Sequence, residues 1–229
     1  MKTTAEIFQQ VLCNAANPDR ALTMRAYMKN QFVFFGVATP ERRQLCRPLM
    51  PQPGQLTATQ LIELVQDLWT FEQRELHYLA IDLLARHFRL LEVSHIDWVL
   101  QLAQTHSWWD TVDGLTSVIG DVLKLHLSAD RHEQSIMDQA LRHENFWIRR
   151  VAMLHQLGWR DQTDVARLFA YSLQLAEEKE FFIRKAIGWA LRDYAWHDPG
   201  RVQQFLARHQ TQLSGLSYRE AAKNLHRLL

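Results

Sequence analysis

The sequence predicts an all-α protein, a HEAT-like α-solenoid. Leu, Ala, Gln, Glu and Arg, which favour helices, dominate the composition, while the 229 residues include only eight Gly and six Pro. Apolar residues recur at helical spacing, and no alternating run of β-branched residues is long enough for a strand. A weak internal repeat has the period of stacked helix pairs.

Capping signals predict where the helices begin. Thr39-Pro40 is typical of an N-cap followed by a first-turn proline, and Asp198-Pro199 repeats the pattern. Capping boxes, with an acidic residue or Gln three positions after a Ser or Thr, are predicted at Thr57, Thr70, Ser107 and Ser217. Asn145 is predicted to cap a helix beginning at Phe146.

Between these caps, apolar residues at helical spacing predict the buried helix faces. The examples are Leu61, Leu64, Val65 and Leu68 in one segment and Val151, Leu154 and Leu157 in another.

The repeat is carried by a Phe-x-x-Arg pattern at helix starts. It occurs at Phe71, Phe146 and Phe181, with intervals of 75 and 35 residues. Helix pairs with a period of roughly 35–45 residues are typical of HEAT repeats, which stack and curve to form a concave surface. No linker is evident, so one domain over residues 1–229, with about six stacked helix pairs, is predicted.

Charge is segregated along the chain, although its net value is only +1. Residues 1–50 carry +4, residues 51–141 carry −8, residues 142–192 carry +3 and residues 193–229 carry +2. Two basic regions therefore flank an acidic one, a distribution that allows a basic concave groove.

Several classes of protein are disfavoured. The two cysteines, Cys13 and Cys46, are too few for a disulfide scaffold and have no metal-ligand spacing. The first residues lack the apolar core of a signal peptide, and no segment is long enough to span a bilayer. The sequence contains no Gly-rich phosphate loop, HExxH or GxSxG motif. An intracellular monomer without metal or cofactor is expected.

The segment from Ser107 to Asp113 contains two tryptophans and two carboxylates at a predicted helix start. Trp109 and Asp113 are four residues apart and share a helix face. An indole face and a carboxylate both stabilise positive charge, so this pair is suited to catalysis on a cationic or sugar-like group. Trp108 and Asp110 are better explained as a core residue and a capping partner.

A second segment, residues 180–196, combines aromatic and basic side chains. Lys185, Trp189 and Arg192 lie on one helix face, and Gly188 lies between them, where it permits close packing or the approach of a ligand backbone. Trp147 with Arg149 and Arg150 has the same composition one repeat earlier. In a single helix Trp189 would be better explained as core and the two cations as its solvated margin. Because the composition recurs, it indicates a nucleic-acid surface, with Arg and Lys for phosphates and rings for sugars or bases.

These strings resemble the AlkD-type DNA alkylation-repair glycosylases, which are built of HEAT-like repeats. The resemblance covers most of the chain. Its specific strings begin at Arg25, Thr39, Ser107, Asn145 and Lys179, and the WWD-x-VD and FFI-x-KAIGW strings are not generic HEAT patterns.

The resemblance implies excision of cationic N3- and N7-alkylated purines from duplex DNA, without base flipping, to leave an abasic site. The family's essential aspartate, two tryptophans and arginine correspond to Asp113, Trp109, Trp189 and Arg150. Its DNA-contacting tyrosine corresponds to Tyr27. The expected DNA-binding cations are Arg43, Arg149, Lys185 and Arg192.

The chemistry of the leaving group is consistent with a site that has a single catalytic carboxylate. A glycosidase ordinarily needs one carboxylic acid for the leaving group and a second carboxylate for the sugar. An N3- or N7-alkylated purine is already cationic and leaves as a neutral base, so the acid is dispensable. Two alternatives stay open: a non-catalytic HEAT-repeat scaffold for a protein partner, and a protein that binds DNA structure without cleaving.

Overall fold

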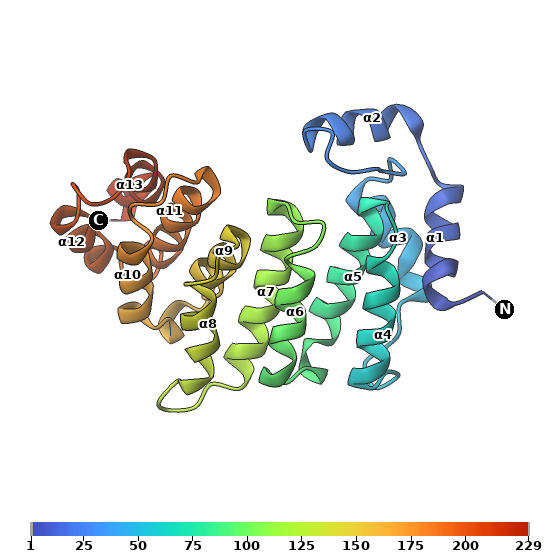
Figure 1. Cartoon of the computed structure of the whole chain (residues 1–229), viewed down its shortest axis with the longest axis horizontal. Helices are drawn as coiled ribbons and strands as arrows, with labels where there is room; N and C mark the ends of the chain where they lie inside the picture. The colour runs from blue at the N-terminus through green and yellow to red at the C-terminus, as the bar shows by residue number, and fades with distance from the viewer. Residues whose placement is uncertain (1, 229) are drawn as a thin grey trace. The chain divides into compact units, whose positions relative to one another are not determined.

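The computed structural model describes residues 2–228, whose regular secondary structure is helical (Figure 1). Within these residues no β-strand forms, and a single bridge pairs Val33 with Gln73. The chain divides into two compact units, Met1–Leu91 and Glu92–Leu229. The prediction of an all-α, HEAT-like fold is confirmed. The predictions of one domain and of a concave groove stay predictions.

The N-terminal unit contains α1 (Thr4–Asn14), α2 (Pro18–Tyr27), α3 (Thr39–Cys46), α4 (Ala58–Trp69) and α5 (Arg74–His87). Helices α4 and α5 pack side by side, and α1 contacts both α3 and α4 (Figure 1). The predicted apolar face of α4 is confirmed, because all four of its residues are buried in this unit's core.

Helix α2 differs from its neighbours because none of its residues is buried. Its placement depends on the segment that follows it. The fully buried carboxylate of Glu75, on α5, accepts backbone N–H bonds from Phe35, Gly36 and Val37. Gly36 has a positive φ of 86°, and a Cβ there would lie 2.1 Å from the Asn17 carbonyl oxygen. The start of α2 can therefore approach the anchored segment only at a glycine.

The C-terminal unit contains nine described helices. They are α6 (Ile96–Leu102), α7 (Trp109–Leu125), α8 (Ser135–Ala140), α9 (Phe146–Leu154), α10 (Val165–Gln174), α11 (Phe181–Ala195), α12 (Pro199–Arg208), α13 (Gly215–Ala222) and α14 (Leu225–Leu228).

Alternate helices of this unit form a continuous row. Helix α7 packs on α9, α9 on α11 and α11 on α13, while α6, α8, α10 and α12 each contact the next helix of the row (Figure 1). This pairing is the HEAT-like arrangement that the repeat predicts. Phe146 and Phe181 open α9 and α11 as the pattern predicts, whereas Phe71 lies three residues before α5, which begins at the arginine of its pattern, Arg74.

Two glycines permit close helix packing within this row. A Cβ at Gly120 would lie 2.2 Å from the His155 carbonyl oxygen, at the α7–α9 contact. A Cβ at Gly188 would lie 2.4 Å from the Glu220 Cβ, at the α11–α13 contact. Packing of α11 on α13, rather than approach of a ligand backbone, therefore explains the mid-helix glycine.

The capping predictions were confirmed at Thr57, Asn145 and Asp198, whose side chains accept the expected backbone N–H bonds. The start predicted at Thr39 is one residue late, because Ala38 is the N-cap.

Three predicted capping boxes were wrong. Thr70 ends α4 and donates its hydroxyl to the Asp67 carbonyl oxygen. Ser107 lies before the N-cap of α7 and donates to the Ala103 carbonyl oxygen, so Asp110 is not its partner. Ser217 lies inside α13, whose N-cap is Ser214. Leu157 was also wrongly predicted to be buried, since it follows the end of α9 and is 38% exposed.

Candidate active site

Asp113 and Arg150 form a two-pronged ion pair between α7 and α9. The Arg150 Nε donates to Asp113 Oδ1 at 2.7 Å, and Nη2 donates to Oδ2 at 2.8 Å. The third nitrogen, Nη1, donates to the Phe182 carbonyl oxygen at the start of α11. One guanidinium therefore ties together three successive helices of the row.

The pair is buried on one side and open on the other. The Arg150 side chain is 1% exposed, whereas that of Asp113 is 25% exposed. Burial raises the pKa of Asp113, and the hydrogen bonds and charge of Arg150 oppose that rise. The carboxylate is thus held rigidly by the protein and still reaches solvent.

Trp189, on α11, lies beside this pair. The Arg150 Cζ lies 5.2 Å from the centre of the indole, within cation–π range. A second cation, the Lys185 Nζ, lies 5.3 Å from the same ring centre. Trp189 is partly exposed, and its buried Nε1 has no hydrogen-bond partner among the described residues.

Trp109 is the first residue of α7, so Asp113 follows it by one helical turn. Its side chain is also partly exposed. Trp108 instead joins an aromatic cluster, with its ring 5.9 Å from Trp147 and 5.3 Å from Phe182. Trp147 is the most buried tryptophan of this group, at 7% exposure, which confirms the prediction that it is more buried than Trp109 and Trp189.

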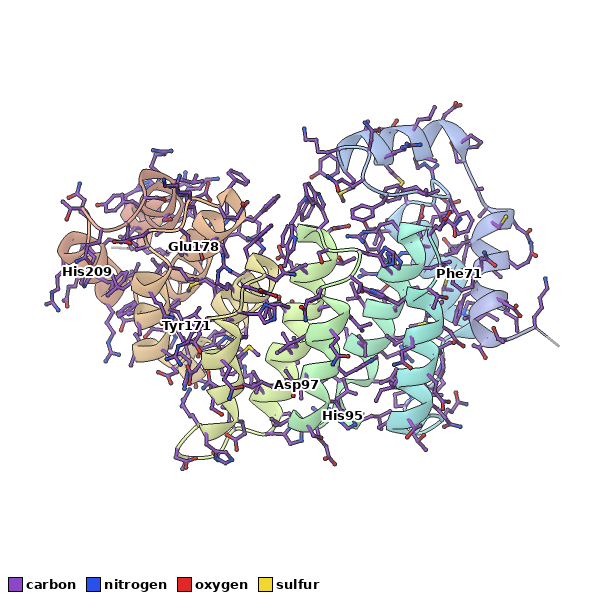
Figure 2. The ribbon with its side chains drawn as sticks, in the orientation of Figure 1. Phe71, His95, Asp97, Tyr171, Glu178 and His209 are labelled. Atoms are coloured by element: carbon purple, nitrogen blue, oxygen red, sulfur yellow. The ribbon has the colours of Figure 1, made fainter. Side chains whose placement is uncertain are left out.

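Arg149 faces away from this group. Its Nη1 donates to the carbonyl oxygens of His143 and Glu144, and Nη2 donates to the Glu178 carboxylate at 3.0 Å. Glu178, labelled in Figure 2, precedes α11. Arg184, the equivalent residue one repeat later, likewise donates to the Glu178 carbonyl oxygen. The arginine of the Phe-x-x-Arg pattern therefore stabilises the loop before its own helix in both repeats.

Lys185 and Arg192 share one carboxylate, that of Glu220 on α13. The Lys185 Nζ lies 2.9 Å from Oε1, and the Arg192 Nη1 lies 2.6 Å from Oε2. The hydrogen bond from Lys185 is the main cause that lowers the pKa of Glu220. All three side chains are mostly buried, so the two cations are paired within the protein.

Tyr27 and Arg43 belong to the N-terminal unit. Tyr27 is the last residue of α2 and is 69% exposed. Arg43, on α3, is exposed and pairs with Asp82, which also pairs with the buried Arg42. These arginines line an open cavity of about 270 Å³ between α3 and α5, together with Cys46, Arg47, Met50, Leu79 and Arg86.

Residues 2–228 contain neither a metal-binding group nor a helix suited to a membrane. No three His, Cys, Asp or Glu side chains of this part of the chain are grouped so that they could hold a metal ion. No helix in it combines the length and the apolar character that crossing a membrane requires.

Sequence reasoning missed Glu220 as part of this group. Its position three residues after Ser217 suggested a capping partner, whereas its side chain binds two cations on another helix. Gly188 was the available signal, since a glycine inside a helix often marks the close approach of another element. It indicated a close contact but not the residue that makes it.

Comparisons with known proteins give matches over most of the chain. The family described as DNA alkylation repair enzyme matches residues 8–225. A solved structure described as a predicted DNA alkylation repair enzyme from Enterococcus faecalis is 33% identical to the chain, with a TM-score of 0.84. The match covers 91% of this chain and 95% of that chain. No curated protein matches.

Proposed function

Because the chain belongs to the family of DNA alkylation repair enzymes, we propose that it is a monofunctional DNA glycosylase for cationic N3- and N7-alkylated purines. It would hydrolyse the N-glycosidic bond in duplex DNA and leave an abasic site. The observation that carries the proposal is the partly exposed Asp113 carboxylate, which Arg150 fixes from its buried side.

The proposed reaction uses Asp113 as its only carboxylate. As the bond between C1′ and the purine nitrogen breaks, its electron pair neutralises the positively charged base. The sugar becomes oxocarbenium-like, and the carboxylate stabilises it. Water adds to C1′ and passes its proton to Asp113 and then to solvent. Arg150 occupies one acceptor position on each oxygen, so further lone pairs are free for this work.

The tryptophans fit a role around the sugar. Trp189 and Trp109 are both partly exposed, and Trp189 is held by its contact with Arg150. Ring faces favour developing positive charge, so the two indoles would cup the deoxyribose. The resemblance to AlkD-type glycosylases supports excision of the base without flipping it into a pocket.

We assign the functional arginine to Arg150 and a loop-stabilising role to Arg149. Arg150 binds Asp113 directly, whereas the Arg149 guanidinium is occupied by Glu178 and two carbonyl oxygens. Tyr27 and Arg43 are proposed to contact DNA outside the lesion, as are Lys185 and Arg192. DNA phosphates would compete with Asp82 and Glu220 for the three cations.

A second function, binding of damaged or branched DNA without cleavage, is favoured by one observation. Both Asp113 oxygens are engaged by Arg150, as in an ion pair that only stabilises the fold. Such a protein would bind DNA through the same cations. For both functions the proposed binding partner is DNA inside the cell.

One experiment separates the two functions: release of free 7-methylguanine from methylated duplex DNA. A glycosylase releases the base, and Asp113→Asn abolishes the release. Uracil-containing duplex is the matched substrate control, because uracil leaves poorly without an acid. Release from neither DNA, with binding intact, would favour the non-cleaving protein, and efficient uracil release would contradict the single-carboxylate mechanism.

A further inference from the structure

Glu220 lies next to the proposed site because α11 has no side chain where α13 crosses it. A Cβ at Gly188 would lie 2.4 Å from the Glu220 Cβ and 3.0 Å from the Ser217 carbonyl oxygen. Ser217 reinforces the crossing, since its hydroxyl donates to the Arg184 carbonyl oxygen. The backbone thus delivers the Glu220 carboxylate to the α11 face that carries Trp189.

On that face, Glu220 bridges two cations that flank Trp189. Lys185 is one turn before the indole and Arg192 is nearly one turn after it. Each cation contacts a different oxygen of the carboxylate. Lys185 at the same time lies within cation–π range of the indole. The charge that Trp189 experiences on this side is therefore the sum of Lys185, Arg192 and Glu220.

A second carboxylate compensates the other cation that contacts Trp189. Arg150 approaches the ring at 5.2 Å, and its charge is compensated by Asp113. Two cations contact the indole, and together with Arg192 and the two carboxylates that pair with these cations they carry a net charge of +1. Without Glu220 the net charge would be +2, and two unpaired cations would stand beside the ring.

We propose that Glu220 is an electrostatic positioning residue of the active site, acting through Lys185 and Arg192. It keeps these cations from repelling the positive charge that develops on the deoxyribose as the base leaves. It also competes with DNA phosphates for these two cations and so weakens their contribution to DNA binding. The proposal rests on the proposed glycosylase function and adds a residue on α13 to that site.

This role predicts opposite effects on binding and on chemistry when the charge of Glu220 is removed. In Glu220→Gln, Lys185 and Arg192 become available to phosphates. Binding to undamaged duplex should tighten several-fold, with a salt slope steeper by about 0.9 for each phosphate gained. The single-turnover rate of 7-methylguanine release at saturating protein should fall about tenfold, because one uncompensated charge acts on the sugar cation over a short distance.

The test measures both quantities on matched variants. Asp198→Asn is the control, because it removes one negative charge from the same unit, at the Arg201 pair on α12, and should change neither quantity. Lys185→Met combined with Glu220→Gln restores the net charge of +1, so its release rate should recover toward that of the wild type. A purely structural role of Glu220 would instead lower affinity and rate together.

Weaker binding together with slower release by Glu220→Gln overturns the proposal, as does no change in either. If Glu220→Gln does not fold, the double variant compared with Lys185→Met asks the same question, since Arg192 is then the cation that Glu220 neutralises. If the wild type releases no methylated base, the glycosylase function fails. The binding measurements still decide whether Glu220 competes with DNA phosphates for the two cations.

Discussion

Arg149 and Arg150 are adjacent in the chain, yet they pair with carboxylates on different segments. Arg149 binds Glu178 in the loop before α11, whereas Arg150 binds Asp113 on α7. Neighbouring positions on a helix differ by about 100°, so one guanidinium stabilises a loop while the other reaches the candidate site.

The first prediction separates these two arginines. Arg149→Ala should lower the stability of the protein by about 1–3 kcal/mol, because it removes charge-assisted hydrogen bonds to a loop. Its release of 7-methylguanine, measured below its melting temperature, should stay close to that of the wild type. Arg150→Ala should release little 7-methylguanine even at temperatures at which the protein is fully folded. Equal loss of release by both variants would contradict the assignment.

Asp113→Asn tests the carboxylate itself. The variant should keep DNA affinity and lose roughly 10²–10³ in release rate, the usual effect of losing one preorganised group. Asp110→Asn is the control on the same helix. It lies in the first turn of α7, so its loss should cost about 0.3–1 kcal/mol of stability through the helix dipole and leave release nearly unchanged. Near-normal release by Asp113→Asn would remove this residue from the mechanism.

The pH dependence of release follows from the burial of Asp113. Burial favours the neutral acid and raises the pKa of Asp113 above its ordinary value of 3.8. The reaction needs the ionised form, so release should fall as pH drops through this raised pKa, at a higher pH than for an exposed aspartate. Arg150 opposes the rise in pKa, so in Arg150→Gln the loss of release on the acidic side of the pH profile should occur at a still higher pH. If the loss of release in this variant instead shifts to lower pH, a group other than Asp113 controls the acidic side of the profile.

Three tryptophan variants distinguish a catalytic surface from the core. Trp147→Ala should cost about 3–5 kcal/mol, as for other buried aromatic residues. Trp109→Ala and Trp189→Ala should destabilise the protein less and reduce base release more, because both rings are partly exposed. Thermal melting beside the release assay measures both effects. Unfolding by Trp109→Ala with a stable Trp147→Ala would reverse the assignment.

Local signals predicted the helices well and their contacts poorly. Thr57, Asn145 and Asp198 cap helices as predicted, since an N-cap needs only backbone groups two or three residues away. Ser217 matches the same local pattern, yet its hydroxyl binds the Arg184 carbonyl oxygen on α11. A partner that comes from another helix leaves no trace in local spacing.

The same limit applies to the site. Asp113 and Trp109 lie on one helix, so their spacing was enough to associate them. Arg150 is 37 positions away from Asp113, and only the family resemblance associated the two. Glu220 lies 35 positions beyond Lys185, on the far side of a tight helix crossing, where neither spacing nor resemblance indicated it.

Glu75 has a consequence for how α2 can vary. Its carboxylate holds the backbone, not the side chains, of residues 35–37, and α2 itself contributes no buried residue. The position of α2 is therefore set by this anchored segment together with Arg20, whose Nη1 donates to the Gly36 carbonyl oxygen and to the Glu41 carboxylate. Because α2 has no buried residue, substitutions on it other than at Arg20 leave the buried core unchanged. Under the proposed function, α2 is a helix on which preferences for DNA sequence or shape could evolve without disturbing the buried core.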